Sequence, residues 1–280
     1  MSAVPRLLVA YLRRDRWQLL IWAAVTGLLV FGASTAVGGE FDSEADRRGL
    51  VTIAASNPAF LFLRGVPDGF GYGAVLFFMM FAFLGVMAGL MSTFLVTRHT
   101  RADEDLGRAE LLGGTPAGRS APLTAVLLLA LLANSLLALV VGAALLTPGL
   151  PPAGSVLTGV AVAAAGLPFA GFAAVTAQLM PSARGANGIA AAMVGVAYLL
   201  RGIGDALAVP SADISTAESA WPAWLSPIGW AQRVAPFTDG DTRPLLLTLG
   251  LFAALGGAAL WLRAHRDLGA SLVRERAGRN

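Results

Sequence analysis

The sequence predicts an all-α membrane protein with six transmembrane helices and both termini in the cytosol. Hydrophobic residues make up 56% of the 280-residue chain and charged residues only 13%, which is about half the charged share of a typical soluble domain. Six apolar stretches reach the roughly 20 residues that a helix needs to cross the hydrocarbon core. The arginines gather at alternate ends of these stretches, which is typical of multi-pass membrane proteins.

The six expected spans are residues 18–38, 72–97, 122–146, 155–180, 187–207 and 244–262. A turn signal rich in proline and glycine, residues 147–152, separates the third span from the fourth. With the N-terminus placed inside, fourteen arginines lie in inner segments and five in outer ones, and Arg201 lies within the fifth span. This asymmetry supports the orientation, since inner loops carry the excess of positive charge.

Residues 1–17 predict an amphipathic helix on the inner membrane surface, with Trp17 as its anchor. Apolar residues recur there at helical spacing, and they are Val4, Leu7, Leu8, Tyr11 and Leu12. The alternative is an ordinary positively charged leader to the first span. Residues 18–262 then form the six-span domain, and residues 263–280 form a cytosolic tail.

Two segments expected on the outer side of the membrane differ from each other in composition. Residues 50–63 are apolar but are broken by Asn57-Pro58, so this stretch is too short to span and is expected to lie flat or to re-enter. Residues 208–243 carry three tryptophans, which suit the outer membrane interface.

A charged segment, residues 98–119, joins the second span to the third. Thr100 can cap a helix that begins at Arg101, with Asp103 at the reciprocal position of a capping box. Gly113 and Gly114 would end this helix after about three turns. One interpretation is a solvated connection between two spans.

The other interpretation of the charged segment is a coupling helix that docks on a cytosolic partner. Its mixed charge and small apolar face suit such a contact. The candidate contact residues are Asp103, Glu104, Asp105, Arg108 and Glu110, with Arg184 in the next inner loop as a second contact.

Four segments in this order resemble membrane subunits (permeases) of ABC-2-type exporters, and most closely the actinobacterial polyketide-antibiotic (tetronasin-type) exporters. They are residues 101–112 (RADEDLGRAELL), 184–188 (RGANG), 225–234 (LSPIGWAQRV) and 266–270 (RDLGA). The resemblance implies a permease in a bacterial plasma (inner) membrane. It implies that a cytosolic ABC ATPase dimer, which binds ATP and Mg, drives the export of hydrophobic compounds such as drugs and polyketide antibiotics.

The chain has no lysine, so it cannot hold a Walker A phosphate loop. We therefore expect no cofactor on this chain and ATP hydrolysis on a separate subunit. Members of the resembled group are often about twice this length, with two six-span halves. The chain is then either a half-size member or a truncated product, and a second half or a homodimer would enclose the pathway.

Polar residues inside the spans are candidates for the transport pathway. Arg201 and Asp205 are four apart on one helix and can pair, and intramembrane charges often mark function. Alternatively, Arg201 snorkels to the outer surface and Asp205 lies in water. Asn134 and Gln178 are interpreted as hydrogen-bonding groups between helices rather than as ligands.

An alternative function is a secondary carrier or membrane scaffold without an ATPase, with Arg201 and Asp205 as a proton-sensitive pair. Catalytic and metal sites are not expected, because the chain has no cysteine and only two histidines, His99 and His265, without other ligands at metal spacing. The net charge of +3 is explained by arginines at span ends, so nucleic acid is not an expected partner.

Overall fold

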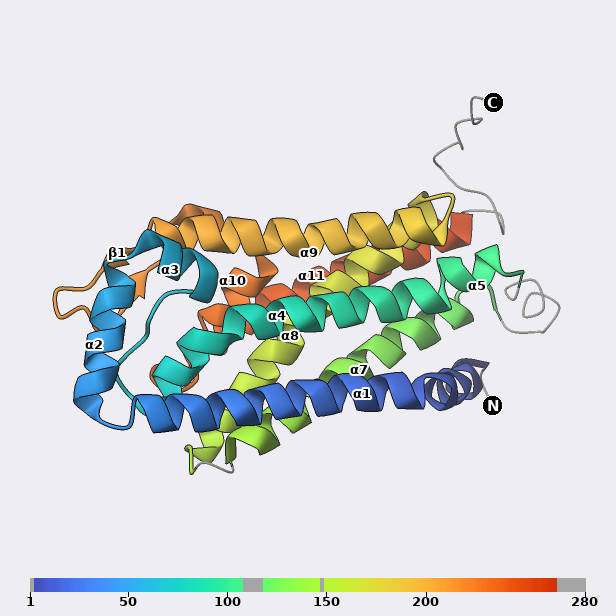
Figure 1. Cartoon of the computed structure of the whole chain (residues 1–280). Helices are drawn as coiled ribbons and strands as arrows, with labels where there is room; N and C mark the ends of the chain where they lie inside the picture. The colour runs from blue at the N-terminus through green and yellow to red at the C-terminus, as the bar shows by residue number, and fades with distance from the viewer. Residues whose placement is uncertain (1–2, 108–117, 147–148, 266–280) are drawn as a thin grey trace, which may run out of the picture.

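The structure is a computed structural model, and it describes residues 3–107, 118–146 and 149–265. Six of the described helices are long and apolar enough to cross a membrane, and they form an elongated bundle (Figure 1). They are α1 (Ala3–Glu40), α4 (Tyr72–His99), α7 (Ala121–Leu146), α8 (Pro152–Leu179), α9 (Ala183–Ala206) and α11 (Arg243–His265). The predicted all-α six-span fold is confirmed, with most span ends within a few residues of their expected places.

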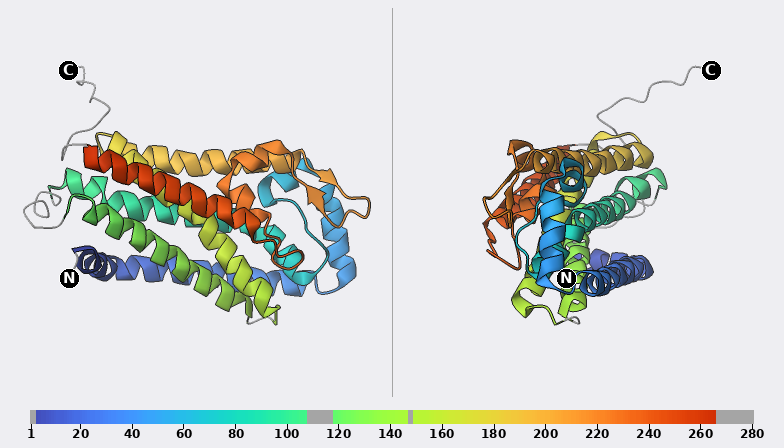
Figure 2. Two further views of the ribbon diagram at one scale, coloured as in Figure 1. Left: turned by 180° about the vertical axis from the view of Figure 1, so that it is seen from behind. Right: turned by 60° about the vertical axis from the view of Figure 1, so that its left-hand side comes forward.

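Short elements close the end of the bundle that lies away from the N-terminus (Figure 1). The described ones are α2 (Glu44–Ala55), α3 (Pro58–Arg64), β1 (Val209–Pro210), β2 (Ala217–Glu218) and the 3-10 helix η1 (Trp221–Leu225). The short helix α10 (Pro227–Gln232) lies deeper, between α9 and α4 (Figure 1), and packs against α8 and α11. β1 and β2 pair antiparallel. We call this the outer end, in keeping with the predicted orientation. The opposite, inner end carries α5 (Arg101–Asp105), the start of α1 and the end of α11 (Figures 1 and 2).

The apolar stretch 50–63 does not form one spanning helix. It supplies the end of α2 and most of α3, and α2 lies across the ends of the spans (Figure 1). Asn57 separates the two helices, since its side chain accepts hydrogen bonds from the backbone N–H groups of Ala59 and Phe60. Pro58 follows at the first helical position, where its missing N–H is not needed.

α8 lies at the centre of the bundle and packs against α4, α7 and α11. Small residues allow this close packing. A Cβ added at Gly159 would lie 2.1 Å from the carbonyl oxygen of Ala138 in α7, and one added at Gly166 would lie 2.2 Å from Asn134 Oδ1. A side chain at either position would therefore force α8 away from α7.

The predicted interfacial helix and the first span form one continuous helix, α1. Figure 1 shows the first turns of α1 nearly end-on while the rest runs across the view, so the helix axis bends near its start. The predicted apolar face exists and packs against the protein's own core, with Tyr11 buried. Trp17 is 66% exposed. The position of this segment on the membrane surface stays a prediction.

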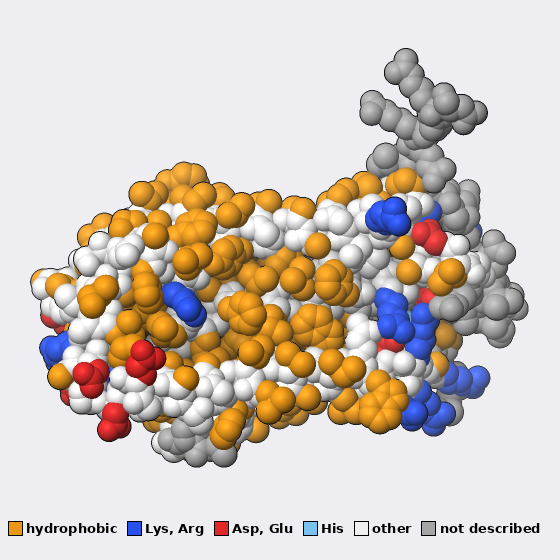
Figure 3. All heavy atoms as spheres, viewed as in Figure 1, with side chains coloured by type: hydrophobic (Ala, Val, Ile, Leu, Met, Phe, Trp, Pro, Cys, Tyr) orange, Lys and Arg blue, Asp and Glu red, His pale blue; other side chains and the backbone are white. Residues whose placement is uncertain are grey.

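Charge divides the surface into three zones. On the face seen in Figure 3, apolar side chains cover the middle of the molecule and charged side chains gather at its two ends. Basic side chains are concentrated at the inner end on this face. Such a belt between polar ends is what a bilayer-spanning bundle presents to lipid.

Candidate functional site

The side chain of Asp103 joins the short helix α5 to α1. Both carboxylate oxygens of Asp103 accept hydrogen bonds from Arg14 of α1, at 3.0 and 2.8 Å. Asp103 therefore takes no part in the expected capping box. Thr100 does precede the helix, but its hydroxyl donates to the carbonyl oxygen of Val96 at 2.7 Å and makes no cap hydrogen bond.

The prediction of a three-turn helix is wrong, because the observed helix is shorter. α5 ends at Asp105, and Gly107 follows with φ of 70°. Glycine adopts this left-handed conformation readily, so Gly107 ends the helix in the way that had been expected of Gly113. Arg108, Glu110, Gly113 and Gly114 lie outside the described residues.

A second inner-end contact joins α1 to α4 through two buried groups. His99 Nε2 lies 2.5 Å from Asp15 Oδ2, and both side chains are fully buried. Arg98 lies 3.3 Å from the other carboxylate oxygen of Asp15. The Tyr11 ring lies against the imidazole, with ring centroids 4.5 Å apart.

Sequence reasoning missed Asp15 and His99 as an inner-end pair. The available signal was that Asp15 follows Tyr11 by four residues and so continues the apolar face of the first helix. A carboxylate on such a face needs a buried partner.

The other charges of α5 tie it to α9 and α11. Glu104 accepts from Arg101 at 3.1 Å and from Arg263 of α11 at 2.8 Å. Arg101 also donates to the carbonyl oxygen of Pro181. Asp105 accepts from the backbone N–H of Ala183, the first residue of α9, at 2.7 Å.

These contacts define an inner-end network that links α5 to α1, α9 and α11 and also joins α1 to α4. Its carboxylates are Asp15, Asp103, Glu104 and Asp105, and their partners are Arg14, Arg98, Arg101, Arg263 and the imidazole of His99. Loss of one partner from a buried pair leaves the other charge uncompensated, which costs about 3–5 kcal/mol. A displacement of α5 therefore has to move these helices with it or break the network.

The predicted ATPase-contact residues that the structure describes divide into two groups. The side chains of Asp103 and Glu104 are only 11% and 6% exposed and are turned into the network. Asp105 and Arg184 are exposed at the inner end. Leu106, which sequence reasoning did not select, is 63% exposed directly after α5. Asp105, Leu106 and Arg184 thus form the accessible part of this site.

Arg201 and Asp205 are fully buried near the outer end of α9. Arg201 donates to Asp205 at 2.7 Å and to the carbonyl oxygen of Phe62 in α3 at 2.6 Å. Asp205 also accepts from Ser219 at 2.6 Å and from Gln232 of α10 at 3.1 Å. The predicted pair therefore exists, and the alternative of a snorkelling Arg201 with a solvated Asp205 is wrong. The pair joins α9 to α3, α10 and the loop before η1.

Asn134 and Gln178 are buried in the bundle. Asn134 of α7 donates to Ser92 of α4 at 2.8 Å, which is the hydrogen bond between helices that the sequence had suggested. Gln178 donates to the carbonyl oxygen of Ala174 in its own helix at 3.4 Å.

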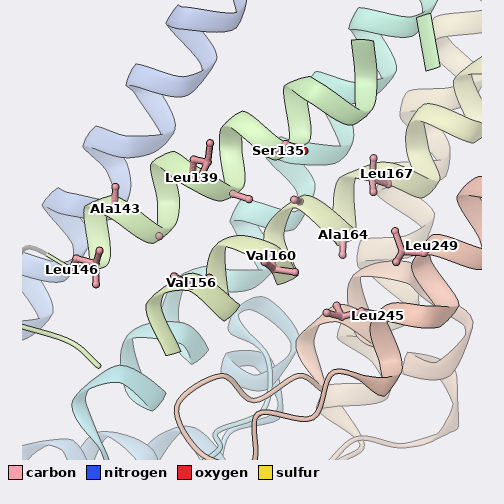
Figure 4. A pocket seen from close by; sticks show the side chains of 13 residues that line it. Ser135, Leu139, Ala143, Leu146, Val156, Val160, Ala164, Leu167, Leu245 and Leu249 are labelled. Atoms are coloured by element: carbon pink, nitrogen blue, oxygen red, sulfur yellow. The ribbon is translucent and has the colours of Figure 1, made fainter. Parts of the chain in front are cut away.

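An apolar groove of about 580 Å³ lies between α7, α8 and α11 (Figure 4). Among the described residues, leucine, valine, alanine and glycine line it, and Ser135 is the one polar side chain, already bonded to the carbonyl oxygen of Leu131. The groove is large enough for a drug-sized ligand, but its described lining presents no charge that would orient one. No group of three or more His, Asp or Glu side chains within the described ranges could hold a metal ion.

The chain is similar to a permease of known sequence. The chain is 40% identical over 277 residues to a multidrug efflux system permease protein of Mycobacterium tuberculosis. The alignment covers 97% of this chain but 48% of the relative, so the chain spans about half the length of that protein. No family model matches the chain.

Proposed function

We propose that this chain is a permease unit of an ATP-driven, ABC-2-type exporter that moves hydrophobic compounds out of a bacterial cell. The observation that carries the proposal is the 40% identity, along nearly the whole chain, to a multidrug efflux permease. Drugs and polyketide antibiotics are the substrate classes that the sequence resemblance implies.

The proposal includes a second six-span unit. The aligned relative is about twice as long as this chain. A second half or a second copy of the chain would pair with it, and together the two units would enclose the pathway in the lipid bilayer.

ATP and Mg would bind to a separate cytosolic ATPase dimer. Asp105, Leu106 and Arg184 supply the exposed contact surface at the inner end, and Arg108 and Glu110 remain candidates in the part of the charged segment that the structure does not describe. Asp103 and Glu104 would transmit movement rather than touch the ATPase, because their carboxylates hold α5 to α1 and α11.

The alternative of a secondary carrier has less support from the geometry. A proton-sensitive carrier pair needs access to water, whereas Arg201 and Asp205 are 0% exposed and surrounded by their own hydrogen-bond partners. This arrangement supports a structural role that holds the outer end together.

Two charge-changing substitutions test the contact surface. Leu106→Asp and Arg184→Glu should each reduce both the ATPase that purifies with the chain and drug-stimulated ATP hydrolysis by the complex. Leu207→Asp is the matched control, because Leu207 is 62% exposed at the other end of the bundle. If the two inner-end variants assemble and hydrolyse ATP as the wild type does, this surface is not the contact.

A further inference from the structure

A second groove, of about 450 Å³, lies between α3, α4 and α9. We call it the α3–α4–α9 groove. Its lining combines one cation with an otherwise largely apolar wall, and consists of Leu63, Arg64, Met79, Phe83, Val86, Gly195 and Tyr198. The face of Figure 3, which carries α4 and α9 in Figure 1, is apolar along its middle apart from an isolated basic side chain.

Arg64 is the group in this groove that could recognise a ligand. Its Nη1 donates to the carbonyl oxygen of Met79 at 2.8 Å, and no carboxylate pairs with it among the described residues. The hydroxyl of Tyr198 is already used, since it donates to the carbonyl oxygen of Leu63 at 3.0 Å. The guanidinium therefore retains donors for an anion.

The groove is placed within the membrane-spanning part of the bundle. Met79 is seven residues into α4, about 10 Å from the outer end of that helix at 1.5 Å per residue, and Val86 lies about 10 Å deeper. A cation beside hydrocarbon is unfavourable unless a counter-charge or water satisfies it. The cation thus sits at the outer side of the groove, and the apolar wall continues toward the middle of the bundle.

We propose that this groove binds an anionic amphiphile, with its carboxylate or phosphate on Arg64 and its apolar tail along Phe83, Val86 and Gly195. Charge complementarity selects this occupant over a neutral or cationic one. A lipid of the outer leaflet and a hydrophobic acid share this chemistry. The step from binding to export rests on the proposed function, whereas binding itself does not.

The test uses the full chain reconstituted in phosphatidylcholine, with spin-labelled stearic acid and its methyl ester as probes at pH 9. The motionally restricted fraction of the spectrum gives the relative association constant of each probe. The wild type should prefer the acid to the ester. Arg64→Gln should weaken acid binding about tenfold, which is the effect of losing a hydrogen bond to a charged group, and Arg64→Lys should retain much of the preference. Arg243→Gln, at the outer end of a different face, should change neither probe.

A second pair of variants tests the tail region. A Cβ added at Gly195 or at Gly188, both in α9, would meet no atom within 4 Å, so leucine at either position should be tolerated by the fold. Gly195→Leu should weaken the binding of acid and ester alike, because it fills the groove. Gly188→Leu is the matched control and should weaken neither.

The source of the occupant is decided by adding phosphatidylglycerol to the bilayer. Displacement of the labelled acid would identify an anionic lipid as the occupant, and no displacement would identify a hydrophobic acid.

Three results would overturn the proposal: equal binding of acid and ester by the wild type, unchanged acid binding by Arg64→Gln, and disulfide formation between two copies of Phe83→Cys. The last would show a second copy covering the groove, since the chain has no other cysteine. The binding assay contains no ATPase, so its failure is distinct from failure of the proposed function.

Discussion

The buried pair of Arg201 and Asp205 gives the sharpest prediction about stability. Asp205 accepts hydrogen bonds from Arg201, Ser219 and Gln232, and its side chain is fully buried. Asp205→Ala would leave the Arg201 guanidinium buried with only neutral oxygens as partners. Breaking a buried pair in this way costs about 3–5 kcal/mol, so the free energy of unfolding should fall by that amount.

The assay is equilibrium unfolding of the detergent-solubilised chain, followed by tryptophan fluorescence. Asp241→Ala is the matched control, because Asp241 and Arg243 form a pair of similar length at 2.8 Å in which the arginine side chain is 87% exposed. Exposed pairs contribute little. Asp241 also accepts a hydrogen bond from the backbone N–H of Arg243 at 2.9 Å, so this variant should lose some stability but much less than Asp205→Ala. The double variant Arg201→Met, Asp205→Ala should recover much of the lost stability, since it leaves no unpaired charge.

Two results would refute this reasoning about Arg201 and Asp205. One is equal destabilisation by Asp205→Ala and Asp241→Ala. The other is a double variant that is no more stable than Asp205→Ala alone. Either result would mean that burial of the Arg201 charge does not dominate the energetics of this site.

Three further predictions concern packing, pH and the inner-end network. Gly159→Val should lower the melting temperature, because its Cβ would lie 2.1 Å from the carbonyl oxygen of Ala138. Gly188→Ala should raise or preserve the melting temperature, because the space there is open and alanine favours helix. Equal shifts in the two variants would contradict the steric argument. Burial raises the pKa of the Asp68 carboxyl, so the folded state holds the proton more tightly than the unfolded state. Stability should therefore fall as pH rises from the pKa of the unfolded state through that of the folded state. Asp68→Asn should remove this fall from melting curves recorded across that pH range, and an unchanged pH dependence would exclude a contribution from Asp68. Asp15→Asn should release His99 and loosen the contact between α1 and α4, seen as faster amide hydrogen exchange at the inner end, and unchanged exchange would argue against that link.

The spans could be predicted because length and polarity alone decide whether a helix suits a bilayer. The i, i+4 spacing likewise predicted that Arg201 and Asp205 can pair. Their enclosure could not be predicted, because it depends on Phe62, Ser219 and Gln232. Phe62 lies 139 positions from Arg201 along the chain, and Ser219 and Gln232 lie 14 and 27 positions from Asp205. One sequence does not reveal such contacts.

The charged segment shows where local rules were insufficient. Its acidic residues fit the first turn of a helix, and Asp103 also fitted a capping box. The structure instead uses Asp103 and Glu104 in tertiary ion pairs with Arg14 and Arg263. Asp103 forms the long-range ion pair rather than the local cap, because a buried carboxylate needs a full counter-charge.

Transport in sealed inverted vesicles distinguishes an ATP-driven exporter from a carrier driven by the proton gradient. The vesicles contain the chain assembled with its ATPase, and accumulation of a fluorescent hydrophobic dye is measured. The account predicts accumulation that requires ATP outside the vesicle, stops with vanadate and survives collapse of the proton gradient. Accumulation that continues without ATP and stops when the gradient collapses would contradict it.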